Sequence, residues 1–145
     1  MTKKIRVLFI CTANAARSQM AEGLLRAKFG SKFTVFSAGT RQSKVSTRAI
    51  QVMQEIGIDI SGQHSKGVEI YLGKTLFHYL ITVCDKAEKN CPTNWPGVNH
   101  RLHWSFEDPA AFEGTDQEKL EKFRTIRDQI EKRIIDWIAE QAAQS

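Results

Sequence analysis

The 145-residue sequence lacks any long apolar run. The longest near the N-terminus, VLFIC at residues 7–11, is far short of the roughly 20 residues that span a bilayer, and no small-residue cleavage site follows it. We therefore expect a cytoplasmic protein that does not associate with a membrane.

The sequence also has few prolines, no internal repeat and no low-complexity tract. Three prolines, 41% hydrophobic residues and 26% charged residues are typical of an ordinary globular chain. A chain of this length falls within the usual size of one domain. We expect a single domain over residues 1–145.

The sequence has no block of charge of one sign. Its formal net charge is +5, but lysine and arginine are scattered among aspartate and glutamate. We expect no nucleic-acid binding and a monomeric protein, whereas the basic balance suits a small anionic substrate.

Cysteine is scarce, and the three cysteines do not form a disulfide framework. Cys11, Cys84 and Cys91 are odd in number and follow no framework spacing. In a reducing compartment such thiols indicate chemistry more readily than structural crosslinks.

Segments with the apolar pattern of strands alternate along the chain with segments that have helical periodicity. Residues 3–10, 33–39, 78–84 and 99–104 have the pattern of strands, whereas 18–30, 46–57 and 117–139 have helical spacing. A short helix fits 68–76, and 85–97 is expected to be a loop. Strands alternating with helices predict an α/β fold, an open four-stranded parallel sheet with helices on both faces.

Three reactive side chains follow predicted strands directly. Cys11, Cys84 and Asp108 each lie just past a strand end. In open parallel sheets ligands bind beyond the carboxyl ends of the strands, so we expect these three residues on the same rim.

The stretch CTANAARS at residues 11–18 has the features of an anion-binding loop. A loop that leaves a strand and enters a helix can turn successive backbone N–H groups toward one point, near the positive end of the helix. Arg17 adds a planar two-pronged donor. The residues expected to bind an oxyanion are Thr12, Ala13, Asn14, Ala15, Ala16 and Arg17.

The same surroundings favour the thiolate form of Cys11 and make it a candidate nucleophile. Ser18 can donate a hydrogen bond to the sulfur, although a role as helix N-cap also explains this serine. The alternative is that Cys11 is a buried strand-end cysteine and Arg17 an ordinary surface residue.

The segment CTANAARSQMAEG resembles the signature loop of the low-molecular-weight phosphotyrosine phosphatase superfamily, and FEDPA at 106–110 resembles its Asp-Pro motif, whose aspartate is the general acid. Similar segments are SAGT, AIQVMQEIGIDIS, ITVCDKAEKNCP and LHWSFEDPA. Within the superfamily the chain most resembles the thioredoxin-coupled arsenate reductases. The resemblance implies the same fold and the same use of the loop.

The resemblance also implies a relay of three thiols. Cys84 and Cys91 have the spacing of the second and third redox thiols of the reductases. Cys11 would displace an oxygen of arsenate while Asp108 supplies a proton, Cys84 would attack Cys11 with release of arsenite, and Cys91 would attack Cys84. The final disulfide would be reduced by thioredoxin, with no bound cofactor or metal, and phosphate or sulfate would compete with arsenate.

Seven residues of helix rise about 10.5 Å, whereas a disulfide needs Cα atoms within roughly 7 Å. The segment between Cys84 and Cys91 must therefore be a loop already or unwind.

Other activities fit part of the pattern. A tyrosine phosphatase or low-specificity phosphomonoesterase would use Cys11, Arg17 and Asp108, and an anion-binding or redox-sensing protein would need no turnover. Asp108 could instead form a turn before Pro109. A zinc site of Cys84, Cys91, His100 and His103 has suitable ligands, but its gaps do not match common zinc-finger spacings.

Three positions depart from the pattern of the reductases. The reductases usually carry a cysteine where this chain has Ala16, and they often carry a glycine where it has Ala13. Some reductases hold potassium near the loop, and here Asn14, Glu22 and Ser37 match its ligands but Lys66 replaces the acidic one. We expect the Lys66 ammonium to stand in for the ion, so that no potassium binds.

Overall fold

The structure, a computed structural model, describes residues 3–90 and 94–144. Cys91 lies outside these residues. The elements in chain order are β1 (Ile5–Cys11), α1 (Arg17–Phe29), β2 (Phe33–Gly39), α2 (Thr47–Gln54), the 3₁₀ helix η1 (Val68–Ile70), β3 (Phe77–Thr82), α3 (Asp85–Asn90), β4 (Val98–His103), the 3₁₀ helix η2 (Pro109–Ala111) and α4 (Asp116–Gln144).

The four strands form one parallel sheet in the order β2-β1-β3-β4. The expected α/β fold is confirmed. The central strand β1 is buried without interruption from Val7 to Cys11, because both of its faces are covered. Its apolar run therefore holds the first cysteine at the carboxyl edge of the sheet.

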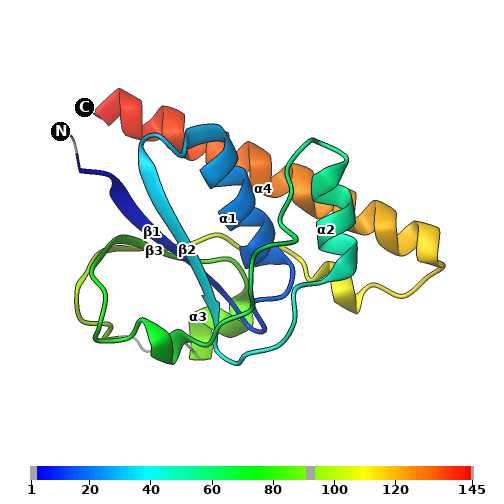
Figure 1. The fold of residues 1–145 in the computed structure, drawn as a ribbon, viewed down its shortest axis with the longest axis horizontal. Helices are drawn as coiled ribbons and strands as arrows, with labels where there is room; N and C mark the ends of the chain where they lie inside the picture. The colour runs from blue at the N-terminus through cyan, green and yellow to red at the C-terminus, as the bar shows by residue number, and fades with distance from the viewer. Residues whose placement is uncertain (1–2, 91–93, 145) are drawn as a thin grey trace.

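The helices arrange the carboxyl edge of the sheet. In Figure 1, α1, α2 and α4 lie together on one side of the strands, and α3 lies near their carboxyl ends. Helix α1 packs on β1, β2 and α4, while α3 contacts β1 and β3. The loops that enter α1 and α3 therefore open onto the same edge.

The expected loop at 85–97 is wrong in its first part, since residues 85–90 form α3. The segment shows no apolar stripe, but Asp85 and Glu88 lie in its first turn, where carboxylates favour a helix, and Ala87 is buried. The strand before it ends at Thr82, so Cys84 lies two residues beyond the strand and directly before α3.

Other predicted boundaries shift. Helix α1 begins at Arg17 without a side-chain cap, so the N-cap role considered for Ser18 is wrong. Helix α2 begins with Ser46 as its N-cap, as expected, but ends at Gln54, because the chain turns through Gly57 at a φ of +80°. The proposed helix at 68–76 shrinks to η1, and α4 extends beyond the predicted 117–139 at both ends.

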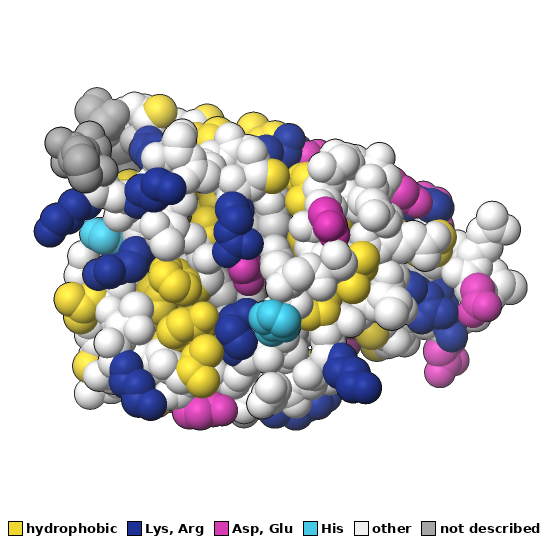
Figure 2. Space-filling model, in the orientation of Figure 1, with side chains coloured by type: hydrophobic (Ala, Val, Ile, Leu, Met, Phe, Trp, Pro, Cys, Tyr) yellow, Lys and Arg dark blue, Asp and Glu magenta, His cyan; other side chains and the backbone are white. Residues whose placement is uncertain are grey.

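Lysine and arginine are interspersed with aspartate and glutamate across the face drawn in Figure 2, with no basic block on it. No helix within the described part of the chain is long and apolar enough to cross a membrane.

Candidate active site

The loop between β1 and α1, residues 12–16, is held from outside by its carbonyl groups. The carbonyl of Cys11 accepts from the Thr40 amide at 3.2 Å and that of Thr12 from the Arg41 amide at 3.0 Å. The Ser65 hydroxyl donates to the Ala13 carbonyl at 3.0 Å. Three further carbonyls of the loop also accept hydrogen bonds from outside it. Gln19 Nε2 donates to the carbonyl of Asn14, the Ser46 amide to that of Ala15 and the Met20 amide to that of Ala16.

The orientation of the carbonyls determines that of the amides. In a planar trans peptide the C=O of one residue and the N–H of the next point in opposite directions. Because the carbonyls of residues 11–15 point outward, the N–H groups of residues 12–16 turn toward the inside of the loop. This is the arrangement expected for an oxyanion cradle.

Asn14 fixes the shape of this loop. It is the described non-glycine residue with a positive φ, +51°, and it is fully buried. Its Oδ1 accepts from Gln19 Nε2 at 2.9 Å and from the Lys66 amide at 2.8 Å, and these bonds offset the strain of the left-handed conformation.

Cys11 and Ser18 are in contact within the loop. The two atoms Cys11 Sγ and Ser18 Oγ lie 2.8 Å apart, and Asn14 Nδ2 donates to the same Ser18 oxygen at 2.8 Å. Because Ser18 accepts from Asn14, its own hydrogen is available for the sulfur. Of the two roles considered for Ser18, the structure shows the contact with the sulfur.

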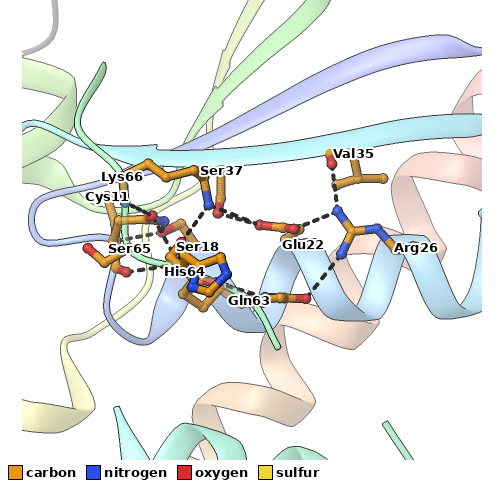
Figure 3. A network of polar contacts seen from close by, with 12 residues as sticks. Cys11, Ser18, Glu22, Arg26, Val35, Ser37, Gln63, His64, Ser65 and Lys66 are labelled. Carbon is orange, nitrogen blue, oxygen red and sulfur yellow. Dashed lines mark hydrogen bonds and ion pairs between the residues drawn. The ribbon is translucent and has the colours of Figure 1, made fainter. Parts of the chain in front are cut away.

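Behind the loop lies a polar network that includes the predicted cation position (Figure 3). The Ser37 hydroxyl donates to Glu22 Oε1 at 2.5 Å, Arg26 contacts Glu22 Oε2 at 2.5 Å, and the Lys66 ammonium lies 3.9 Å from Glu22 Oε1. Burial lowers the pKa of Lys66, and the Glu22 carboxylate acts in the opposite direction. The ammonium is thus a second cation that faces Glu22, besides the guanidinium of Arg26.

A cavity of about 740 Å³ opens in front of the loop and is lined by both described cysteines. Arg17 donates to the Phe106 carbonyl at 3.0 Å and lies 3.7 Å from Asp108 Oδ2. Asp108 also accepts from the Ala110 amide at 3.0 Å as the N-cap of η2. The turn-forming role considered for Asp108 is therefore real, and it holds the carboxylate beside the arginine.

Cys84 is the second thiol of the cavity. It is 2% exposed, and its Sγ lies 3.4 Å from Thr12 Oγ1 in the anion loop and 3.4 Å from the Ala87 amide, which donates to it. Both described cysteines are free thiols. The structure therefore brings Cys11, Arg17, Cys84 and Asp108 to one cavity, with Ser18 buried and in contact with Cys11, while Cys91 lies outside the described residues.

Sequence reasoning missed several residues of the cavity wall. Arg41 and Ser43 follow β2, Lys86 lies on α3, and Ser105 follows β4. Arg41 comes two residues after a strand end, so the rule that placed Cys11 on the rim could have found it. Among the described residues no group of three metal-ligating side chains occurs, and His103 contacts Thr82 and Asp85.

The sequence of the chain is similar to those of known proteins. Residues 6–145 match the model of the low molecular weight phosphotyrosine protein phosphatase family. An arsenate reductase of Halalkalibacterium halodurans is 44% identical over 134 residues, which are 92% of this chain and 94% of that protein.

Solved structures share the fold. An arsenate reductase in the phosphate binding state has a TM-score of 0.75 at 36% identity and covers 94% of this chain and 98% of its own. A thioredoxin-dependent arsenate reductase of Corynebacterium glutamicum has a TM-score of 0.67 at 31% identity and covers 98% of this chain and 64% of its own.

Proposed function

The chain belongs to the low molecular weight phosphotyrosine protein phosphatase family, and on this premise we propose that it reduces arsenate to arsenite with the thiols of Cys11, Cys84 and Cys91 and with thioredoxin as the external reductant. One observation carries the proposal: a second buried thiol, Cys84, lines the same cavity as Cys11. Hydrolysis of a phosphate ester needs no second thiol, whereas reduction does.

Arsenate binds with its oxygens against the inward amides of the loop and the guanidinium of Arg17. The amides lose no other partner, because the loop is held by its carbonyls. A tetrahedral oxyanion of the same shape and charge, such as phosphate or sulfate, competes for this cradle.

Cys11 then attacks arsenic, and one oxygen leaves. The Ser18 hydroxyl stabilises the attacking thiolate, and Asp108, entering this step as the neutral acid, gives its proton to the leaving oxygen, which departs as water. Asp108 lines the cavity with a side chain about half exposed, so that it can take up a new proton from solvent. The product is an arsenic(V) thioester of Cys11.

Cys84 attacks the sulfur of Cys11 in the second step. The S–As bond breaks, its electron pair goes to arsenic, and arsenite leaves while a Cys11–Cys84 disulfide forms. Two electrons thus pass from two thiols to arsenic. Thr12, in contact with Cys84 Sγ, ties this thiol to the loop that holds the substrate.

Cys91 completes the relay by attacking Cys84, which frees Cys11. Cys84 and Cys91 are seven positions apart and all six residues between them form α3, so a disulfide between the two requires α3 to unwind at least in part. Thioredoxin then reduces the Cys84–Cys91 disulfide, and its own two thiols are oxidised to a disulfide.

The test is arsenite release by three single variants, Cys11→Ser, Cys84→Ser and Cys91→Ser, supplied with thioredoxin, thioredoxin reductase and NADPH. We expect each variant to lose multiple turnover. Hydrolysis of p-nitrophenyl phosphate, which needs only the first thiol, should disappear in Cys11→Ser alone.

Phosphate-induced thermal stabilisation of Cys84→Ser and Cys91→Ser serves as the control, because it shows that the cradle is intact. Wild-type rates of arsenite release by Cys84→Ser would contradict the relay. Hydrolysis without any arsenite release by the wild type would identify the protein as a phosphatase.

A further inference from the structure

The carbonyl groups that hold the anion loop from outside have two kinds of donor. Some accept from backbone amides, namely those of Cys11, Thr12, Ala15 and Ala16. The carbonyl of Ala13 accepts instead from the Ser65 hydroxyl at 3.0 Å, and that of Asn14 from Gln19 Nε2 at 3.0 Å. The peptide units on both sides of Asn14 are therefore oriented by side chains.

The hydroxyl of Ser65 has a defined direction. Ser65 is buried behind the loop, and the Ser43 amide donates to its oxygen at 2.8 Å. Because this oxygen already accepts from Ser43, the hydroxyl hydrogen is directed to the Ala13 carbonyl. Ser65 thus joins the loop to the segment that follows β2.

The chain on both sides of Ser65 is itself fixed along the outside of the loop (Figure 3). The carbonyl of His64 accepts from Gln19 Nε2 at 2.9 Å, and the amide of Lys66 donates to Asn14 Oδ1 at 2.8 Å. The hydroxyl between them is therefore in place before an anion binds.

The peptide unit between Ala13 and Asn14 has a reason to rotate. Asn14 has a φ of +51°, which residues other than glycine rarely adopt. Rotation of this peptide unit by about half a turn changes the ψ of Ala13 and the φ of Asn14, and it returns φ to negative values. The side chain of Asn14 need not move, so its bonds to Ser18, Gln19 and Lys66 are compatible with the rotation.

The rotated peptide unit is unsuited to an anion. Rotation turns the N–H of Asn14 away from the inside of the loop and puts the carbonyl oxygen of Ala13 in its place. The partial negative charge of that oxygen repels an oxyanion where the N–H would have bound it. A bond that prevents the rotation therefore preserves the cradle.

We propose that Ser65 is a positioning residue for oxyanion binding: its hydroxyl holds the peptide unit between Ala13 and Asn14 with the N–H turned inward, against a rotation that would relieve the left-handed conformation of Asn14. The proposal rests on the oxyanion cradle of the proposed function and does not depend on the relay of thiols.

Removal of the hydroxyl lowers the fraction of molecules whose loop is ready to bind. The apparent Kd rises in inverse proportion to that fraction, and the loss of one hydrogen bond corresponds to a Kd for phosphate about 3- to 10-fold higher. In the bound state the N–H is turned inward again, and Cys11 and Ser18 keep their contact. The KM for arsenate therefore rises by a similar factor, whereas kcat changes little.

The experiment compares Ser65→Ala with the wild type. Binding of inorganic phosphate is measured by isothermal titration calorimetry, and KM and kcat are measured from arsenite release. Ser61→Ala is the matched control, because Ser61 is an exposed serine of the same connection and contacts Asp59 rather than the loop. We expect the Kd and KM to rise in Ser65→Ala alone, and the melting temperature without phosphate verifies that both variants are folded.

The amide resonance of Asn14 in a ¹⁵N-labelled chain reports the rotation directly. In the wild type, saturating phosphate should move this resonance downfield, because the N–H then donates to an anion. In Ser65→Ala, the resonance should differ from the wild type without phosphate and reach the wild-type position when phosphate is saturating. The amide of Ala16, oriented through the bond from Ser46 to the Ala15 carbonyl, should respond to phosphate alike in both chains.

An equal Kd for phosphate in Ser65→Ala and Ser61→Ala would overturn the proposal. So would an Asn14 amide in the wild type that phosphate leaves unshifted. The absence of phosphate binding to the wild type would contradict the cradle, and the assignment of Ser65 with it. The absence of arsenite release would contradict the reductase function, while the Kd for phosphate would still decide the role of Ser65.

Discussion

At the scale of single residues, Cys11 contacts a hydroxyl that is itself oriented by a neighbour. Asn14 donates to Ser18, and Ser18 is left with its hydrogen for the sulfur. A hydrogen bond to a charged group contributes about 1.5–3 kcal/mol.

We therefore expect Ser18→Ala to lower the rate of the first chemical step about 10- to 100-fold, measured as kcat for arsenite release. Ser31→Ala, at an exposed position, should match the wild type. A rate for Ser18→Ala within twofold of the wild type would mean that Ser18 does not stabilise the nucleophile.

Lys66 gives a second prediction at this scale. Its ammonium faces Glu22, so potassium chloride in place of sodium chloride should leave the melting temperature of the wild type unchanged. Lys66→Asp supplies an acidic oxygen beside Asn14, Glu22 and Ser37, and potassium should then stabilise the variant by about 1.4 kcal/mol at ten times its Kd. Selective stabilisation of the wild type by potassium would contradict this account.

The sequence predicted the positions of the candidate reactive residues better than the residues that orient them. Cys11, Arg17 and Asp108 line the cavity as expected, because a thiol at a strand end, an arginine at a helix start and an Asp-Pro motif have recognisable types and places. The bond from Ser65 to the Ala13 carbonyl could not be found, since it joins segments 52 residues apart. Contacts of this kind depend on tertiary packing, which periodicity does not encode.

At the scale of elements, α3 is the helix that the sequence did not predict. Apolar periodicity identifies a helix by the face that it buries, and α3 buries only Ala87 among residues 85–89. It is stabilised by carboxylates in its first turn and by their partners on neighbouring strands. Because the helix has no apolar face, we expect it to unwind at low cost.

Helices α2 and α4 are joined by a carboxylate whose contribution can be measured. Glu55, after α2, accepts from Arg124 at 2.8–3.1 Å and from Arg127 at 3.0 Å. The hydrogen bond from Arg124 lowers the pKa of Glu55, burial opposes this, and Arg127 lowers it further. The stabilisation is therefore present above the ordinary glutamate pKa and is lost as the pH falls through the lowered value.

We expect Glu55→Gln to reduce the free energy of unfolding by about 1 kcal/mol at pH 7, measured with urea, and by less at pH 3. Glu113→Gln, in the exposed segment before α4, is the control. A loss that is equal at both pH values would show that the charge of Glu55 contributes nothing.

At the scale of the whole molecule, the alternation of strands and helices was sufficient to predict the sheet and the edge on which the site lies. Cys11 and Cys84 meet at one cavity because β1 and β3 are parallel neighbours whose carboxyl ends coincide. Asp108 arrives from five residues beyond β4 and depends on η2 for its position. The end of a strand therefore predicts the positions of Cys11 and Cys84 more directly than the position of Asp108.

Anion binding should stabilise the whole fold. Phosphate at 100 times its Kd stabilises a protein by about 2.7 kcal/mol, which calorimetry or thermal unfolding can measure. We expect this gain in the wild type and its loss in Arg17→Ala, while Arg48→Ala, which removes an exposed pair with Asp116, retains it. Equal stabilisation of the wild type and Arg17→Ala would remove Arg17 from the cradle.

The most direct test of the account is a single turnover with arsenate in the absence of thioredoxin, followed by acid quenching, alkylation and mapping of the disulfides. The account predicts one arsenite released per chain, loss of two thiols, a disulfide between Cys84 and Cys91, and a free Cys11. Release of arsenite with all three thiols intact, or with Cys84 still reduced, would contradict it.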